Sequence, residues 1–279
     1  MLFIILRRLL QAALVLLLVA LVAFTIFRYI GDPVESLLGQ EATVADQRAL
    51  IERLGLDDPI PVQYLRFVGN ALSGNFGVSY RTAEPVSTLI AERLPATLEL
   101  ALVSALFAMT LGTLLGIYTA IYRDGFVAHA IMSSSLIGVS LPTFLIGVLL
   151  IWVFAVELGW LPSVGRGETV QIGFWSTGFR TASGLKSLIL PAITLGLYQM
   201  TLIMRLVRSE MLEVLRQDFI RFARARGLPE RVVYVGHALK NTMVPVITIA
   251  GLQLGAIIAC ALITETGFQW PGGGRMCVT

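Results

Sequence analysis

The chain has 279 residues, of which 56% are hydrophobic and only 14% are charged, with a formal net charge of +3 at pH 7. A soluble domain usually carries about 25% charged residues, so the composition excludes an ordinary soluble globular protein. Several uninterrupted apolar stretches reach the roughly 20 residues that a helix needs to cross a bilayer. We therefore expect an all-α membrane protein with several spans.

Residues 1–30 contain the first expected span. Arg7 and Arg8 precede an almost wholly apolar run over residues 9–27. The run is longer than the apolar core of a signal peptide, and no A-x-A cleavage pattern follows it. Because basic residues favour the cytoplasmic side, we expect an uncleaved span with its N-terminus in the cytoplasm.

Residues 31–97 differ in composition from their surroundings. Gly31-Asp32-Pro33 is expected to end the first helix, since proline lacks a backbone N–H. From Arg28 to Arg93 there are six arginines and nine acidic residues, and this acidic excess suits the outer side of the membrane. We expect a small extracytoplasmic segment.

Residues 98–279 are expected to form the core, with four further spans at about 98–121, 130–155, 188–207 and 242–263. Pro142 lies inside the second of these and permits a kink, because proline frees a backbone carbonyl. Whether that kink serves packing or gating stays open. Residues 156–187 are expected to form a second outer loop, rich in Gly, Ser and Thr.

Small residues recur along the last of these spans. Gly251, Gly255 and Ala259 lie four residues apart, a pattern that lets membrane helices approach closely. Cys260 follows them within the same apolar run, where we expect a packed thiol.

The most basic stretch lies between the fourth and fifth spans. Residues 205–240 contain eight basic and four acidic residues. A plain cytoplasmic loop that obeys the positive-inside rule would explain this charge. With the first span running outward, the fourth also arrives in the cytoplasm.

Residues 218–245 have more order than a plain loop needs. Phe219, Phe222 and Ala223 recur at i, i+3 and i+4, which predicts an amphipathic helix. Gly227 and the proline two residues later then interrupt it, and a second short helix can follow. Such a basic helix-turn-helix can lie at the membrane surface and dock on a soluble partner.

Several kinds of chemistry are missing from the sequence. It contains no G-x-x-x-x-G-K-[ST] loop for nucleotides and no H-E-x-x-H zinc motif. Cys260, Cys277, His129 and His237 form no ligand cluster, so we expect no metal and no cofactor. A membrane-embedded enzyme is disfavoured because no nucleophile and base are paired.

Acidic residues are almost absent from the spans. Glu99 opens the second span and Glu265 closes the fifth, both expected near an interface. A secondary carrier usually needs ionisable groups at mid-membrane, and we also see no inverted repeat. A carrier or channel that works alone is the competing hypothesis, but these absences favour energy supplied from elsewhere.

Residues 221–245 resemble the cytoplasmic coupling segment of ATP-binding-cassette (ABC) importer permeases. The general pattern there is E-A-A, three residues, Gly, nine residues and I-x-L-P, which this sequence keeps only in part. The closer match is the variant of the peptide-importer branch, R-x-A-R-A-x-G-L followed by H-A-L-x-N and a proline. The matching residues are Arg221, Ala223, Arg224, Ala225, Gly227, Leu228, His237, Ala238, Leu239, Asn241 and Pro245.

The resemblance extends along nearly the whole chain. Similar segments occur in the same order, namely LRRLL near the N-terminus, GDPV (31–34), LGLDDPIPVQYLRF (54–67), LSGNFGVSY (72–80), LPATLELAL (94–102), LPAITLGL (190–197), RLVRSEMLEVLRQDFIRFARARGL (205–228) and TETGFQWPGGG (264–274). Together they are similar to the first permease subunit of the dipeptide/oligopeptide/nickel transport group. Members of this group continue past the P-G-x-G motif into a sixth span. The resemblance therefore implies a truncated or frame-shifted chain here, with five spans and its C-terminus outside.

The resemblance implies a type I ABC importer transmembrane domain that is not itself an enzyme. Its implied location is the plasma (inner) membrane of a bacterium or archaeon. Implied partners are a second permease in a heterodimer, two cytoplasmic ATP-binding subunits, an extracytoplasmic solute-binding protein and the lipid bilayer, with no nucleic acid. Peptides are the implied cargo, while nickel complexes, glutathione and other small solutes use similar permeases.

The coupling segment, 208–241, is implied to contact the ATP-binding subunits. The candidate contact residues are Phe219, Arg221, Phe222, Ala223, Arg224, Gly227, His237, Leu239 and Asn241. The three apolar residues of the first helix would enter a groove on that partner, and the arginines would pair with acids at its rim. Pro142 is the candidate for gating or for the transport pathway.

Overall fold

The computed structural model describes residues 2–29, 47–48, 51–52, 55–79, 82, 84–173 and 175–274. The chain divides into two compact units, Met1–Ala91 and Glu92–Thr279. The expected helix break at residues 31–33 and Cys277 lie outside the described residues.

The first unit pairs a long apolar helix with a short amphipathic one. Helix α1 (Leu2–Tyr29) has 28 residues, about 42 Å of helix, which is long enough to cross a bilayer. Helix α4 (Ile60–Leu72) packs against it: the Tyr64 hydroxyl donates to the Leu17 carbonyl at 2.8 Å, and the Tyr64 ring lies edge-on to Phe24. Aromatic contact and one hydrogen bond thus join the two helices.

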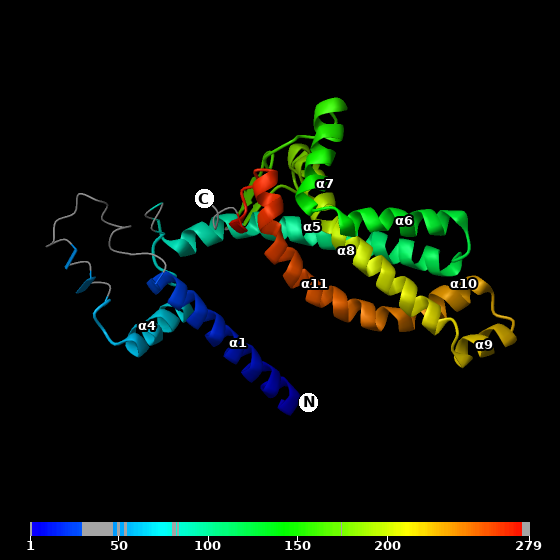
Figure 1. Ribbon diagram of the computed structural model, residues 1–279, viewed down its shortest axis with the longest axis horizontal. Helices are drawn as coiled ribbons and strands as arrows, with labels where there is room; N and C mark the ends of the chain where they lie inside the picture. Colours follow the sequence, from blue (N-terminus) through cyan, green and yellow to red (C-terminus); the bar gives the residue numbers. More distant parts are fainter. Residues whose placement is uncertain are drawn as a thin grey trace. The chain divides into compact units, whose positions relative to one another are not determined.

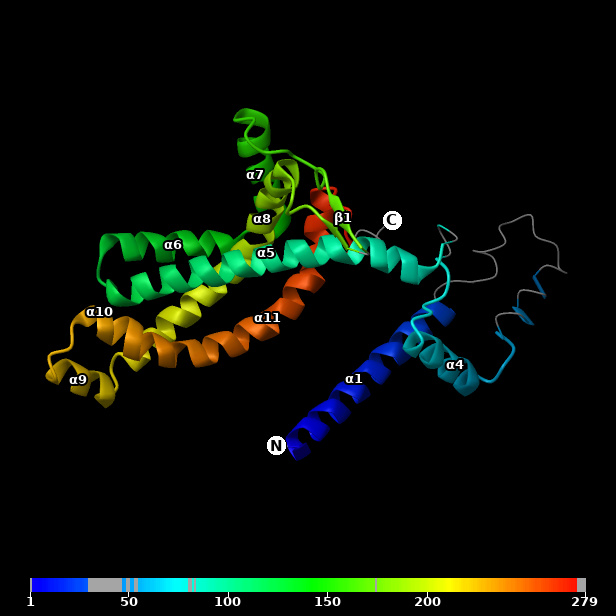
Figure 2. The same cartoon turned by 180° about the vertical axis from the view of Figure 1, so that it is seen from behind.

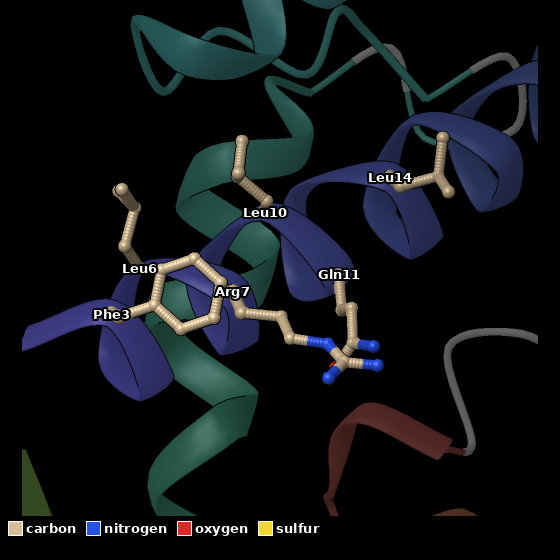
Figure 3. Close-up of a pocket in the computed structure, with 6 residues that line it drawn as sticks. All are labelled: Phe3, Leu6, Arg7, Leu10, Gln11 and Leu14. Carbon is tan, nitrogen blue, oxygen red and sulfur yellow. The ribbon is translucent and has the colours of Figure 1, made fainter. Parts of the chain in front are cut away.

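One face of α1 carries the shallow pocket drawn in Figure 3. All of its lining side chains come from this helix and recur every three or four residues, namely Phe3, Leu6, Arg7, Leu10, Gln11 and Leu14. The leucines and Phe3 are exposed in the chain. A helix that is apolar all round is expected where lipid or another protein surrounds it.

The second unit is built from helices, with a single small hairpin among its described residues. Its elements in order are α5 (Val86–Ile121, beginning within the first unit's range), α6 (Phe126–Ser140), α7 (Thr143–Leu150), the π-helical turn η1 (Ile151–Glu157), β1 (Val170–Ile172), β2 (Trp175–Thr177), α8 (Ala182–Val214), α9 (Asp218–Ala225), α10 (Glu230–Val232), the π-helical turn η2 (Val233–Leu239) and α11 (Lys240–Gly267). The two strands pair antiparallel, with Gln171 opposite Ser176.

Helices α5, α6, α8 and α11 run alongside one another in both views (Figures 1 and 2). The α5–α6 turn, α9 and α10 lie at one end of this bundle, and the hairpin and the last turn of α11 lie at the other. Buried side chains of α8 contribute to all three core clusters, so α8 is the central helix of the unit.

Four helical stretches among the described residues are long and apolar enough to span a membrane: Phe3–Ile26, Val86–Ile121, Ala182–Val214 and Glu230–Gly267. The pair Phe126–Ser140 and Thr143–Glu157 gives a fifth if it is one bent span. The expected all-α, multi-span class is therefore confirmed. The helices extend beyond the predicted 98–121, 188–207 and 242–263, because hydropathy marks the apolar centre and misses polar helical ends.

The predicted span at 130–155 is interrupted in the structure. Helix α6 ends at Ser140, Leu141 is extended, and α7 starts again after Pro142 with a bend of 109°. Proline removes a backbone donor and disfavours helical geometry in the residue before it. The result is a complete break in place of the kink predicted from the sequence.

Close helix packing occurs on α5, away from the small residues predicted to provide it. A Cβ added at Gly112 would lie 2.9 Å from the Met200 carbonyl oxygen, and one at Gly116 would lie 2.8 Å from that of Met204. The G-T-L-L-G pattern of α5 thus lets α8 approach closely. By contrast, nothing lies within 4 Å of a Cβ added at Gly251 or Gly255.

Cys260 is exposed, so the expected packed thiol is also wrong for the chain by itself. Gly251, Gly255 and Ala259 are also exposed in the chain. Hydropathy placed these residues in a span, but it does not say which face of the helix meets the rest of the chain.

Substituting Gly116 by valine is expected to destabilise the second unit by about 1–3 kcal/mol, since the added atoms overlap α8. The midpoint of thermal unfolding of the purified protein in detergent measures this. Gly251→Val is the matched control, because space is open there, and its midpoint should stay near wild type. Equal losses at both positions would contradict the close α5–α8 contact.

Candidate functional site

Helix α9 exposes two of the three apolar residues that its sequence predicted for its outer face. Ile220 and Ala223 are buried, and they pack in a core cluster with Met211 and Val214 of α8. Phe219 and Phe222 are exposed, at 39% and 64%. Ala223 therefore faces the chain's own core, whereas the two phenylalanines lie on the surface, and contact of these residues with a partner protein stays a prediction.

The reason is that an eight-residue helix can have two apolar faces. Ile220 and Ala223 lie three residues apart, and so do Phe219 and Phe222. The i, i+3 spacing alone did not decide which pair turns inward. The smaller pair fills the core, which leaves two aromatic rings on the surface.

Charges at the two ends of α9 match the helix dipole. Asp218 lies in the first turn and Arg224 in the last turn. Arg221 is exposed and lies 3.4 Å from Asp218, a distance at which an exposed pair contributes little. Arg226 lies over the Phe222 ring, 5.8 Å from its centroid, and adds positive charge beside the exposed aromatic surface.

Arg224 has a partner within the chain. Its Nε and Nη2 donate to the two carboxylate oxygens of Glu230 at 3.0 and 3.3 Å, a forked pair that bridges the turn between α9 and α10. Hydrogen bonding to Glu230 raises the pKa of Arg224 above its ordinary value. Arg224 therefore holds the turn in shape.

The backbone of the turn favours glycine at position 227. Gly227 has φ +75°, a left-handed conformation that β-branched residues strongly disfavour, and no other atom lies within 4 Å of a Cβ built there. The predicted break at this position is thus explained by backbone geometry.

The second half of the segment lies against the bundle. His237 and Leu239 are half-buried on η2, and Asn241 is exposed at the start of α11. The Asn241 side chain donates to the His237 carbonyl at 2.9 Å, one turn back on the helix. His237 and Leu239 are thus less accessible to a partner protein than the two phenylalanines of α9 or Asn241. Pro142 lies apart from them, at the exposed bend before α7.

The opposite end of the bundle contains a buried ion pair. Glu99 of α5 is fully buried, and Arg166 donates to it through Nη2 at 2.6 Å. Trp175 Nε1 and the Gly178 N–H also donate to the carboxylate, at 3.1 and 3.3 Å. One carboxylate thus ties the 166–178 loop to α5.

The segment after α11 is fixed beside this pair. Trp270 is fully buried and donates through Nε1 to the Ala96 carbonyl at 3.1 Å, while its ring lies 6.0 Å from the Arg166 guanidinium. Glu265 accepts hydrogen bonds from Thr97 and from the Gly274 N–H. We call Glu99, Arg166, Glu265 and Trp270 the cap cluster.

The sequence did not predict the cap cluster. Glu99 and Glu265 were expected near an interface, but both are fully buried inside the chain. The sequence does show an acidic residue at the edge of each apolar run. Such a residue needs a hydrogen-bond or ion-pair partner when it is buried. That signal does not identify a cation 67 positions away in a Gly- and Ser-rich loop.

Comparison with known proteins shows where the chain belongs. Residues 112–279, more than half of the chain, match the family of binding-protein-dependent transport system inner membrane components. Residues 1–101 match the N-terminal region that accompanies this family. The chain belongs to this family of ABC importer permeases.

Individual relatives agree with this assignment. The chain is 44% identical to the Di/tripeptide transport system permease protein DppB of Pseudomonas aeruginosa (strain UCBPP-PA14), over 93% of this chain and 82% of the relative. It is 40% identical to the Oligopeptide transport system permease protein AppB of Bacillus subtilis (strain 168), and 37% identical to the Glutathione transport system permease protein GsiC of Salmonella paratyphi A. In both cases the match covers 98% of this chain and 85% of the relative.

The chain is thus a transport subunit of the inner membrane with an ABC importer type I transmembrane domain. The resemblance to peptide-importer permeases noted in the sequence is confirmed. The role of the coupling segment stays a prediction.

Removing the charge of Glu99 should destabilise the chain strongly. Glu99→Gln leaves Arg166 buried without its counter-charge, and breaking a buried pair in this way costs about 3–5 kcal/mol. Thermal unfolding of the purified protein in detergent measures the loss. Glu157→Gln, at an exposed position of η1, is the control and should unfold like wild type. A Glu99→Gln protein as stable as this control would contradict the cap cluster.

Proposed function

We propose that this chain imports small peptides or a chemically similar solute, as one of two permeases in a heterodimer. Two cytoplasmic ATP-binding subunits and an extracytoplasmic solute-binding protein complete the assembly. Support for the cargo comes from relatives whose names specify di/tripeptides, oligopeptides and glutathione. The observation that carries the coupling mechanism is the pair of exposed phenylalanines on α9.

The two rings are suited to meet an ATP-binding subunit. Phe219 and Phe222 project from a helix whose other face is locked into the core by Ile220 and Ala223. An aromatic side chain held on a rigid helix loses little conformational entropy when it enters a groove. The nearby arginines, Arg221 and Arg226, supply positive charge for acidic groups at the rim of that groove.

Motion at α9 would reach the spans directly. Ile220 and Ala223 share one core cluster with α8, with η2 and, through Ala120, with the end of α5. When the ATP-binding subunits close, displacement of the α9 rings would therefore move the ends of several spans together. The bend at Pro142 is our candidate for the place where the pathway opens.

The proposed orientation follows from charge. The α9 end of the bundle carries most of the basic stretch 205–240 and faces the cytoplasm, as does the N-terminus with Arg7 and Arg8. Residues 31–97 and the cap cluster then lie on the outer side, where the solute-binding protein docks.

Phe222→Ala should weaken coupling, because truncation of a central aromatic contact typically costs about 2 kcal/mol or more at an interface. We expect about a tenfold loss or more in ATP-dependent peptide uptake by reconstituted vesicles, with less ATP-binding subunit recovered with the permease. Phe179→Ala, an exposed phenylalanine (43%) at the other end of the bundle, is the control for recovery of the ATP-binding subunit, which it should leave unchanged. Uptake that needs an ion gradient in place of ATP would refute the proposed function.

Gly227→Val should reduce uptake, since a β-branched residue at φ +75° costs about 1–2 kcal/mol and distorts the turn that presents α9. Gly227→Asn is the matched control, because asparagine tolerates this conformation much better. ATP-dependent uptake by the two variants, at equal protein levels in the membrane, checks the prediction. Equal uptake by both would show that the turn geometry is unimportant for coupling.

A further inference from the structure

Arg205 is a cation inside the helical bundle without an acidic partner among the described residues. It lies on α8, and its side chain points into the seam with α6, where Nη2 is 3.4 Å from the Ser135 hydroxyl oxygen. Its Nε is covered by protein and has no hydrogen-bond partner. In the part of the chain that the structure describes, no ion pair includes Arg205.

The position is well inside the bundle. Arg205 precedes the end of α8 at Val214 by nine residues, and Ser135 follows the start of α6 at Phe126 by nine residues. Both therefore lie about 14 Å from the α9 end of the bundle. An arginine that merely marked the end of a span would extend outward to the membrane surface, whereas this one points between two helices.

The hydroxyl groups between α6 and α8 already donate hydrogen bonds to backbone carbonyls. Ser135 donates to the Met132 carbonyl at 2.7 Å, and Thr201, one turn before Arg205, donates to the Leu197 carbonyl at 3.1 Å. Their protons are therefore satisfied within their own helices. The guanidinium is the group with donors left over, and leaving a cation unpaired in such a place is costly.

We propose that Arg205, oriented by Ser135, binds the carboxylate of the transported solute on its way through the membrane. This inference rests on the proposed function and names the chemical group that the pathway recognises. The planar fork of a guanidinium matches a carboxylate with two parallel hydrogen bonds. Peptides carry such a carboxylate at their C-terminus, and a lipid phosphate is the other anion that fits the same chemistry.

The test uses the purified permease assembly without its solute-binding protein, so that only the membrane subunits are probed. Thermal unfolding is followed in uncharged nanodiscs with increasing Ala-Ala, and with Ala-Ala-amide as the matched ligand without a carboxylate. We expect Ala-Ala to raise the unfolding midpoint and the amide to have no effect. Arg205→Gln should raise the half-saturating concentration of Ala-Ala about tenfold or more, since a charged hydrogen-bond pair is lost.

Two further variants keep the proposal open to refutation if Arg205→Gln assembles poorly. Arg205→Lys keeps the charge and should retain weakened binding of Ala-Ala, and Ser135→Ala should weaken it less. No midpoint shift with the wild type, an equal shift with the amide, or equal affinity in all variants would overturn the proposal. So would a wild-type protein that is stabilised through Arg205 by anionic lipid and not by Ala-Ala.

Failure of the proposed function is a separate observation. ATP-dependent peptide uptake by the wild-type assembly with its solute-binding protein tests that function without any change at Arg205. If uptake occurs while the Arg205 variants bind Ala-Ala as tightly as wild type, only the inference about the carboxylate is wrong.

Discussion

A buried carboxylate needs hydrogen-bond donors, and the donors that surround Glu99 fix one end of the helical bundle. Glu99 is fully buried on α5, where it pairs with Arg166 and accepts from Trp175 and the Gly178 N–H. Because Glu99 is shielded from solvent by the chain itself, water does not replace a lost partner, and the loop that supplies the donors must remain in place. Trp270 covers the same pair and binds the segment after α11 to α5.

The other end of the bundle depends on packing and backbone geometry. Ile220 and Ala223 anchor α9 in the core, and the Arg224–Glu230 pair and Gly227 shape the turn that follows. Helix α8 passes through the core clusters at both ends, and the glycines of α5 allow it to lie close. One rigid helix thus links the end that carries the exposed aromatic rings to the end that carries the cap cluster.

The sequence predicted the class of fold well because apolar length is a direct requirement of the bilayer. Pro142 and Gly227 were also located, since each imposes a local backbone constraint that is independent of the rest of the chain. The sequence did not predict which residues contact one another across the fold. Nothing local pairs Glu99 with Arg166, decides that Ala223 turns inward and Phe222 outward, or shows that Gly116 packs closely while Gly251 does not. A break as sharp as 109° at Pro142 also depends on what surrounds the helix.

We propose that this permease works only as part of an ATP-driven assembly. The most direct measurement is purification of the tagged chain from its own membranes in mild detergent, followed by mass spectrometry of the proteins that accompany it. We expect a second permease and ATP-binding subunits in the same complex. A chain that purifies alone, from membranes in which uptake of the solute is intact, would refute the proposed assembly.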